Sequence, residues 1–353
     1  MLHRQTMKSH SNYSLKTANR FAVESKTPHI YFPSSDDDLV ALSQLLKDQT
    51  YYLLGDGSNT LFFEELAPVI VAPRFYGVEI QETELGFIVE VGGSENWHNL
   101  VISLIEQNIK GLENLALIPG TVGAAPVQNI GAYGKDISMY CTRVTWFSMT
   151  NQRATQFSNE QCQFSYRDSL FKHDDYNKGI ITKVSFFFPK KWQAQIEYGE
   201  LQTLPPNVTA KEVMEKVIEV RNLKLPNPET LPNAGSFFKN PVVSNQTVSD
   251  LQRTFPDIPV YPVDESNSKL AAGWLIDQAG LKGFTQRSAA VHDRQALVIV
   301  NKGNATGNEI IHLAKFIQSE VHKKFAVHIE PEVRLVSSRG EQPFSAIDVA
   351  SLC

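Results

Sequence analysis

The chain has 353 residues, which suggests two or three domains, and 42% of them are hydrophobic, enough for a substantial core. Lysine and arginine number 33 against 38 aspartates and glutamates, so the net charge is −5. This balance argues against a nucleic-acid-binding protein, because such proteins are usually basic.

The three cysteines, Cys141, Cys162 and Cys353, include no Cys-x-x-Cys pair, which argues against a disulfide framework and against a zinc site. No apolar run approaches the roughly 20 residues that a membrane span needs. The basic N-terminal residues lack the apolar segment of a secretory signal. We therefore expect a cytoplasmic protein without a membrane partner.

The first part of the chain predicts a flexible extension, a helix and a strand. Residues 1–17 are polar and are expected to be loosely held. Ser34 and Ser35 precede three aspartates, which predicts the capped start of a helix over residues 36–49. Metal binding by the aspartates is the less favoured alternative. Residues 51–54 are predicted to form a buried strand.

A polar turn follows that strand, reading Gly55-Asp56-Gly57-Ser58-Asn59-Thr60. These residue types form hairpin turns readily. They would equally suit a turn whose backbone binds phosphate. The residues of this segment alone leave both readings open.

Further along, alternation and helical spacing predict the remaining elements. Strands are expected within residues 69–91, 141–150, 152–158, 180–188 and 296–301. Helices are expected over residues 97–108, 209–220 and 268–279, and from Thr306 to about Phe325. Three prolines between residues 226 and 232 mark a domain boundary.

Residues 114–138 are unusually small and nearly uncharged, and they carry Gly120, Gly123, Gly131 and Gly134. Glycines adopt turns that other residues cannot, and the backbone N–H groups of such a segment can point at phosphate oxygens. The spacing is not that of the usual dinucleotide fingerprint. A tightly packed turn is the alternative, but four glycines favour a cofactor cradle.

Three later positions allow both an ordinary and a functional reading. Arg167 could form a surface ion pair with Asp168 or bind an anion. Ser236 lies between a glycine and two phenylalanines, outside any Gly-x-Ser-x-Gly elbow. Glu332 belongs to an alternating segment that would suit an edge strand. Four histidines, at positions 292, 312, 322 and 328, share no metal-ligand spacing, so no metal site is expected.

Several of these motifs resemble one family. The glycine segment Ile-Pro-Gly-Thr-Val-Gly-Ala-Ala-Pro-Val-Gln-Asn-Ile-Gly-Ala-Tyr-Gly is similar to the diphosphate-binding segment of flavin enzymes related to vanillyl-alcohol oxidase. Within that group it resembles the UDP-N-acetylenolpyruvoylglucosamine reductases. The motifs Leu-Gly-x-Gly-Ser-Asn, Ser-Tyr-Arg-Asp-Ser-Leu-Phe-Lys, Leu-Ala-Ala-Gly-Trp-Leu-Ile-Asp and Glu-Pro-Glu-Val-Arg occur in that family's order. The resemblance covers about residues 18 to 347.

The resemblance implies an α+β fold of three domains. Residues 18–74 with 328–353 would form the first part of an FAD-binding region of the vanillyl-alcohol-oxidase (PCMH) type, and residues 75–225 its second part. Residues 226–327 would form a smaller α+β domain that binds the substrate. Residues 1–17 have no counterpart in this plan.

The resemblance also implies non-covalently bound FAD, NADPH as the hydride donor, a small UDP-sugar as substrate, and a monomer. The residues that it assigns to FAD are Gly55, Gly57, Ser58, Asn59, Thr60, Pro119, Gly120, Thr121, Gly123, Ala124, Gln128, Asn129, Gly131, Ala132, Tyr133 and Gly134.

The same resemblance assigns roles in the reaction, which is the reduction of an enolpyruvyl group. Arg167 and Glu332 would stabilise an enolate-like intermediate, since a guanidinium suits a negatively charged oxygen. Ser236 would donate a proton to carbon. The residues assigned to substrate binding are Tyr166, Tyr198, Lys224 and Asn240, with Tyr198 on a loop that is typical of the first class of these reductases. Arg334 would support the structure.

Two alternatives remain. One is a flavin oxidase of the same fold that uses oxygen; some such relatives tether the flavin through a histidine, and no histidine lies between Tyr51 and Phe63. The other is a nucleotide-sugar-binding module without catalysis, against which Arg167, Ser236 and Glu332 argue.

Overall fold

The computed structural model describes residues 7–173, 175–348 and 350, so that Cys353 lies outside the described residues. The chain forms two compact units. The first gathers residues 1–11, 29–56 and 69–223, and the second gathers residues 12–28, 57–68 and 224–353. Both units mix helices and strands, which confirms the α+β class. The finer division into three domains stays a prediction.

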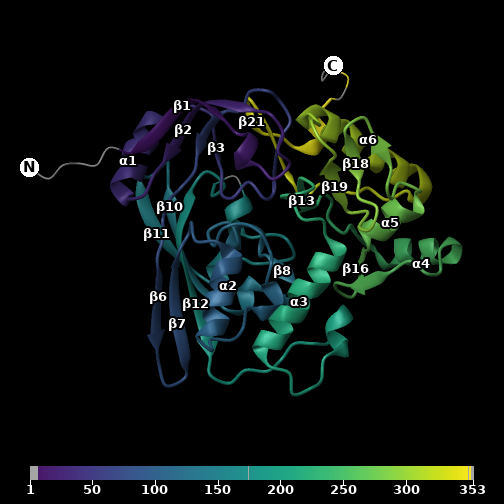
Figure 1. Ribbon diagram of the computed structural model, residues 1–353, viewed down its shortest axis with the longest axis horizontal. Coiled ribbons are helices and arrows are strands. Elements are labelled where there is room, and N and C mark those ends of the chain that lie inside the picture. Colours follow the sequence, from purple (N-terminus) through teal and green to yellow (C-terminus); the bar gives the residue numbers. More distant parts are fainter. Residues whose placement is uncertain (1–6, 174, 349, 351–353) are drawn as a thin grey trace, which may run out of the picture. The chain divides into compact units, whose positions relative to one another are not determined.

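A five-stranded antiparallel sheet, in the order β11-β10-β12-β7-β6, forms the centre of the first unit. Helix α2 (Trp97–Glu106) packs on one of its faces and shares a hydrophobic core with it (Figure 1). The strands are β6 (Val78–Glu82), β7 (Gly86–Gly92), β10 (Cys141–Ser148), β11 (Arg153–Ser158) and β12 (Ile180–Pro189). These elements confirm the predicted strands and the predicted helix.

A second sheet, in the order β1-β2-β5-β3, lies near the start of the chain. It contains β2 (Lys26–Phe32), β3 (Tyr51–Leu53) and β5 (Val69–Val71), of which β2 and β3 both run parallel to β5. Helix α1 (Asp36–Leu45) begins where predicted, because Ser35 accepts the backbone N–H of Asp38 at 3.2 Å. Strand β3 leads directly to Gly55.

The prediction of a flexible extension over residues 1–17 was wrong for its described part. Residues Lys8–Ser14 form strand β1, which is hydrogen-bonded beside β2 and is followed by a short helical turn, Lys16–Ala18. The side chains of β1 are almost all exposed, so its sequence carries no apolar alternation. The strand is held by backbone pairing with a neighbour, which a local pattern does not reveal. Residues 1–6 lie outside the described part.

The second unit is built on three small sheets. Their orders are β13-β19-β18-β17, β14-β16-β15 and β21-β20-β4. The strands are β4 (Thr60–Phe62), β13 (Asn233–Ser236), β14 (Val242–Ser244), β15 (Val260–Pro262), β16 (Asn267–Leu270), β17 (Thr285–Gln286), β18 (Ala289–Val291), β19 (Val298–Asn301), β20 (Arg334–Ser337) and β21 (Gly340–Glu341).

Its helices are α4 (Asn245–Thr254), α5 (Ala272–Gln278) and α6 (Gly307–Phe325). Helix α6 packs against β18 and β19 (Figure 1), and the predicted capping box of Thr306 and Glu309 is present. The predicted helix over residues 268–279 was wrong at its start. Residues 267–270 alternate in burial and pair with β14 and β15, and this two-sided pairing outweighs the helical spacing.

Helix α3 (Ala210–Lys224) also has its predicted capping box, since Thr209 and Glu212 bond each other reciprocally. It continues four residues beyond the predicted end at Val220. The hairpin β8 (Gly131–Ala132) and β9 (Lys135–Asp136) completes the first unit. Of the helices in the described part of the chain, none has the length and apolar character to cross a membrane.

Candidate functional site

The glycine segment of the first unit is fixed by close backbone contacts. Gly120 has a φ of +117°, and its carbonyl accepts the N–H of Trp97 at the start of α2. Gly123 donates its N–H to the carbonyl of Gly93 at 2.7 Å. A Cβ atom on Gly123 would lie 2.9 Å from the Gly93 oxygen and 3.0 Å from that of Ile181. Only glycine fits there without displacing backbone.

The two predicted phosphate-binding turns meet in the first unit. A Cβ atom on Gly55 would lie 3.2 Å from the hydroxyl oxygen of Thr121 and 4.0 Å from Cβ of Ala124. The structure thus brings Gly55 against Thr121 and Ala124 over a long separation in sequence. Small side chains keep the backbone at this junction open to close approach, which fits the diphosphate of a dinucleotide.

From Gly57 onward, the first turn belongs to the second unit. Gly57 has a φ of +65°, and a Cβ atom there would overlap the carbonyl oxygen of Ala18 at 2.0 Å. Asn59 donates its side-chain N–H to the carbonyl of Glu332 at 3.1 Å, and its own carbonyl accepts the N–H of Arg334. Thr60 then begins β4, which pairs in parallel with β20.

Asn129 links the end of the glycine segment to the turn that carries Arg167. It adopts a left-handed φ of 44°, its Nδ2 donates to the carbonyl of Ser165 at 3.1 Å, and its Oδ1 accepts the N–H of Ser138 at 3.2 Å. Ser165 and Asp168 close a turn through reciprocal backbone hydrogen bonds, with Tyr166 and Arg167 at its tip.

The side chain of Arg167 contacts the glycine segment, residues 114–138, which is the predicted cofactor cradle. Its guanidinium donates to the carbonyl of Gly131 at 3.2 Å and lies 5.4 Å from the ring centre of Tyr166. The residue has a φ of +55°, a conformation that is costly for arginine and that often marks functional positions. The carboxylate of Asp168 lies 3.3 Å from His173. The geometry therefore favours the functional reading of Arg167.

Arg221 is a site residue that the sequence reasoning left without a role. Its Nε is buried and has no hydrogen-bond partner among the residues that the structure describes. Burial lowers the pKa of Arg221, nearby Tyr133 raises it, and the positive charge of Arg167 lowers it again. The charge of Arg167 therefore acts on Arg221 within the first unit. Arg221 lies three residues before Lys224 on helix α3, so the two side chains are on the same face of the helix. This spacing was the sequence signal that could have identified Arg221.

Tyr198 lies beside the last glycines of the cradle. Its ring meets that of Tyr133 edge to face, with centroids 6.3 Å apart, and its Cβ lies 3.8 Å from the position that a Cβ on Gly134 would take. The side chain of Tyr198 is 50% exposed. The next residue, Gly199, has a φ of +54° in open surroundings. This arrangement would let the Tyr198 ring contact a ligand that lies on the cradle.

In the second unit, the structure brings Ser236 and Glu332 onto adjacent segments. The backbone N–H of Glu332 donates to the carbonyl of Phe237 at 2.7 Å, and the backbone N–H of Lys239 donates to the carbonyl of Glu330 at 2.8 Å. Ser236 ends strand β13, where it is paired with Val298. The two segments that carry these residues are far apart in sequence and are thereby fixed next to each other by backbone hydrogen bonds.

Ser236 is half-buried and lies between a hydrogen-bonded turn and two buried aromatic residues. Phe237 and Phe238 are fully buried, with their ring centroids 5.1 Å apart. On the other side, buried Asn233 accepts the N–H of Gly235 and donates to the carbonyls of Pro226 and Leu231. Asn233 is thus a second residue that the sequence reasoning missed, and it fixes the turn before Ser236.

Three more residues with predicted roles, Asn240, Lys224 and Arg334, differ in their contacts and exposure. The Oδ1 of Asn240 accepts the N–H of Ala272 at the start of α5, so this predicted substrate-binding residue also caps a helix. Lys224 is the last residue of α3 and is exposed. Arg334 donates Nε to Glu341 at 2.8 Å, in line with a supporting role. Arg167 belongs to the first unit, and Ser236 and Glu332 to the second.

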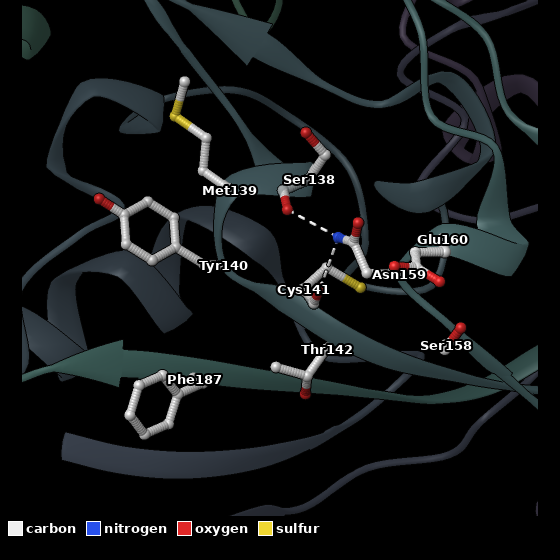
Figure 2. Close-up of a pocket in the computed structure, with 9 residues that line it drawn as sticks. All are labelled: Ser138, Met139, Tyr140, Cys141, Thr142, Ser158, Asn159, Glu160 and Phe187. Atoms are coloured by element: carbon white, nitrogen blue, oxygen red, sulfur yellow. Dashed lines mark hydrogen bonds between the residues drawn. The ribbon is translucent and has the colours of Figure 1, made fainter. Parts of the chain in front are cut away.

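A hollow of ≈ 440 Å³ lies elsewhere in the first unit (Figure 2). It is lined by Ser138, Met139, Tyr140, Cys141, Thr142, Ser158, Asn159, Glu160 and Phe187, none of which is a predicted site residue. Burial raises the pKa of Cys141 and raises that of nearby Cys162 to about 12. Both thiols are therefore protonated at neutral pH, which leaves them poorly reactive.

Comparison with protein families gives two matches. Residues 27–157 match an FAD binding domain, and residues 227–336 match the C-terminal domain of UDP-N-acetylenolpyruvoylglucosamine reductase. The chain is 45% identical over 329 residues to the UDP-N-acetylenolpyruvoylglucosamine reductase of Pseudoalteromonas translucida, covering 93% of this chain and 97% of the relative. It is 41% identical to the Escherichia coli K12 reductase of the same name, covering 96% of this chain and all (100%) of the relative.

The fold is also similar to a solved structure. The crystal structure of UDP-N-acetylenolpyruvylglucosamine reductase from Thermus caldophilus aligns with a TM-score of 0.66 at 22% identity, covering 93% of this chain and 99% of that one.

Proposed function

The chain belongs to the UDP-N-acetylenolpyruvoylglucosamine reductase family, and from this premise we propose that Arg167, Ser236 and Glu332 carry its chemistry. It is an oxidoreductase that uses FAD and NADPH to reduce enolpyruvyl-UDP-N-acetylglucosamine to UDP-N-acetylmuramate, in peptidoglycan precursor synthesis. The observation that carries the residue roles is the backbone hydrogen bond between Phe237 and Glu332, which places the segment of Ser236 next to that of Glu332.

The cradle residues fit FAD. A side chain on Gly123 would collide with backbone, a side chain on Gly55 would crowd the hydroxyl of Thr121, and the two turns that contain these glycines meet at Thr121. We assign the diphosphate to the backbone of these turns, and the rest of the cofactor to the segment that ends at Gly134. When bound, FAD supplies the hydride transfer between NADPH and the enolpyruvyl carbon.

Arg167 and Arg221 supply positive charge, because a guanidinium group stays protonated in proteins. Arg167 and Arg221 both belong to the first unit, where the charge of Arg167 lowers the pKa of Arg221, and the carbonyl of Gly131 accepts a hydrogen bond from the guanidinium of Arg167. A guanidinium in partly buried surroundings stabilises a carboxylate or an enolate oxygen more strongly than it would in water. Arg167 is therefore our candidate for holding the substrate carboxylate as negative charge develops.

Ser236 and Glu332 act at the carbon that gains a proton. Ser236 is half-buried, next to the buried residues Phe237 and Phe238, and its hydroxyl is our candidate for the proton donor. Glu332, on the adjacent segment, is our candidate for stabilising the enolate-like intermediate together with Arg167. Tyr166, Tyr198, Lys224 and Asn240 bind the UDP-sugar in this proposal.

Replacing Tyr198 by phenylalanine or Lys224 by alanine should weaken binding of the UDP-sugar more than it slows reduction of the flavin. The tyrosine contributes one hydrogen bond and the lysine one point charge, so each loss should amount to roughly 1–3 kcal/mol. Titration of the oxidised enzyme with the UDP-sugar measures this. Tyr76→Phe and Lys211→Ala change exposed residues of the same types and serve as controls. Unchanged affinity in both test variants would place Tyr198 and Lys224 outside the site.

We expect FAD to be bound without a covalent bond. The purified protein should be yellow, acid precipitation should leave the colour in the supernatant, and anaerobic NADPH should bleach the native enzyme. A pellet that keeps its colour would show a covalent tether. A colourless protein that FAD cannot reconstitute would contradict the proposed function as a whole.

We further propose that the enzyme is monomeric, acts in the cytoplasm and binds no nucleic acid. The net charge of −5 supports the last point.

A further inference from the structure

Two consecutive buried residues hold the loop that carries Tyr198. This loop, called the Tyr198 loop below, connects β12 to α3. Glu113 and Asn114 lie on a short helical turn, Glu113–Leu115, in the first unit, and both are 0% exposed. One oxygen of the Glu113 carboxylate accepts the N–H of Gly111 at 2.6 Å. The other accepts Nζ of Lys135 at 2.7 Å and the indole N–H of Trp192 at 2.9 Å. One carboxylate therefore joins the end of the glycine cradle to the start of the loop.

Asn114 makes the same connection through its amide. Its Nδ2 donates one hydrogen bond to the carbonyl of Tyr133 at 2.9 Å and one to the carbonyl of Gln195 at 2.8 Å. Because both protons of the Nδ2 group are used, the orientation of the amide is fixed. Its buried Oδ1 has no hydrogen-bond partner among the residues that the structure describes, so these two donated bonds are what the side chain contributes.

The loop is held on both sides of its exposed tip. Trp192 and Gln195 are the bonded positions before Tyr198, and Leu201 is completely buried after it. Between them lie exposed Tyr198 and Gly199. On the cradle, Asn114 is bonded to the carbonyl of Tyr133, and the ring of Tyr133 contacts that of Tyr198. Glu113 and Asn114 therefore hold the base of this loop, at Trp192 and Gln195, beside the cradle.

We propose that Glu113 and Asn114 are positioning residues for substrate binding. They hold the base of the Tyr198 loop against the end of the cofactor cradle, so that Tyr198 at its tip stays within reach of a UDP-sugar. The proposal rests on the proposed function for the identity of the ligand. Fixing the loop in advance reduces the ordering cost of binding, and this gain should appear in the affinity for the UDP-sugar.

Asn159 provides a matched control for Asn114. It is also an asparagine of the first unit, and its Nδ2 donates to two carbonyls, those of Ser138 at 2.7 Å and Cys141 at 2.8 Å, as Figure 2 shows. It therefore has the same side chain and the same bonding pattern, but it does not join the Tyr198 loop. Asn114→Ala and Asn159→Ala remove equivalent hydrogen bonds, and both should lower thermal stability by similar amounts.

The first readout is limited proteolysis of the FAD-loaded enzymes. Trypsin can cut after Lys190 and Lys191, directly before Trp192. Asn114→Ala should be cut there about tenfold faster than Asn159→Ala, because the hydrogen bond from Asn114 to Gln195 no longer holds the segment closed. A factor of ten corresponds to about 1.4 kcal/mol, within the range of a single buried hydrogen bond. Trp192→Phe, which loses only the indole donor to Glu113, should show a smaller increase. This variant keeps the test open if Asn114→Ala does not fold.

The second readout is kinetic. In Asn114→Ala and Trp192→Phe, KM for the UDP-sugar should rise, by about tenfold in the first, while kcat and reduction of the flavin by NADPH stay close to normal. Asn159→Ala should show no such split. Equal cutting and an unchanged KM in Asn114→Ala and Asn159→Ala would overturn the proposal. A native chain that does not turn over the UDP-sugar would instead contradict the proposed function, while the proteolysis comparison would still decide whether the loop is anchored.

Discussion

Replacing Ser236 by alanine should leave reduction of the flavin by NADPH close to its normal rate, while reoxidation by the UDP-sugar falls about 100- to 10,000-fold. A proton donor to carbon is needed only in the second half-reaction, and the range is the usual contribution of general acid catalysis. The variant should fold normally, because the segment is fixed by backbone contacts of Phe237 with Leu297 and Glu332. Alanine fits the place of a serine without disturbing these contacts.

Anaerobic stopped-flow absorbance of the flavin measures both half-reactions of the Ser236→Ala variant. Ser338→Ala removes an exposed hydroxyl in the same unit and is the control. If both half-reactions slow together, Ser236 positions the cofactor or the structure and is not the proton donor. If neither slows, another group donates the proton, and Glu332 is the next residue to replace.

Replacing Lys135 by methionine should lower the free energy of unfolding by about 3–5 kcal/mol. The Lys135–Glu113 ion pair is 2.7 Å long, and its side chains are only 2% and 0% exposed. Removing the lysine leaves the Glu113 carboxylate buried without its counter-charge, since the N–H groups of Gly111 and Trp192 offset only part of the negative charge. Methionine fills a similar volume, so the loss reports the charge and not a cavity.

Thermal unfolding of the FAD-loaded enzyme measures this loss of stability. The control is Lys183→Met, which breaks the more exposed pair between Lys183 and Glu90 and should cost at most about 1 kcal/mol. Removing the buried charge as well, in Lys135→Met with Glu113→Gln, should restore part of the stability. Equal unfolding temperatures for Lys135→Met and Lys183→Met would contradict the importance of the buried pair.

The sequence predicted best those elements that local chemistry determines. Ser35 before three aspartates started α1 at the expected residue, and Thr306 with Glu309 did the same for α6. The long apolar run of β12 was predicted almost to the residue. In each case the signal lies within a few positions of the element, so no knowledge of distant neighbours was needed.

Elements that depend on distant partners were missed or misread. Strand β1 exposes its side chains and is held by pairing with β2, and residues 268–270 became a strand because β14 and β15 flank them. The same limit applies to the site. Glycines and motif residues could be named, but the neighbourhood of Arg221 and Arg167 required the fold. Asn240 was assigned to the substrate before its bond to the start of α5 was visible.

The most direct test of the central claim is the anaerobic reaction of the NADPH-reduced enzyme with enolpyruvyl-UDP-N-acetylglucosamine, followed by flavin absorbance and by the mass of the product. We predict that the yellow colour returns without oxygen and that UDP-N-acetylmuramate appears in an amount equal to the flavin reoxidised. Colour that returns only when oxygen is admitted, with the UDP-sugar recovered unchanged, would contradict the claim and indicate a flavin oxidase.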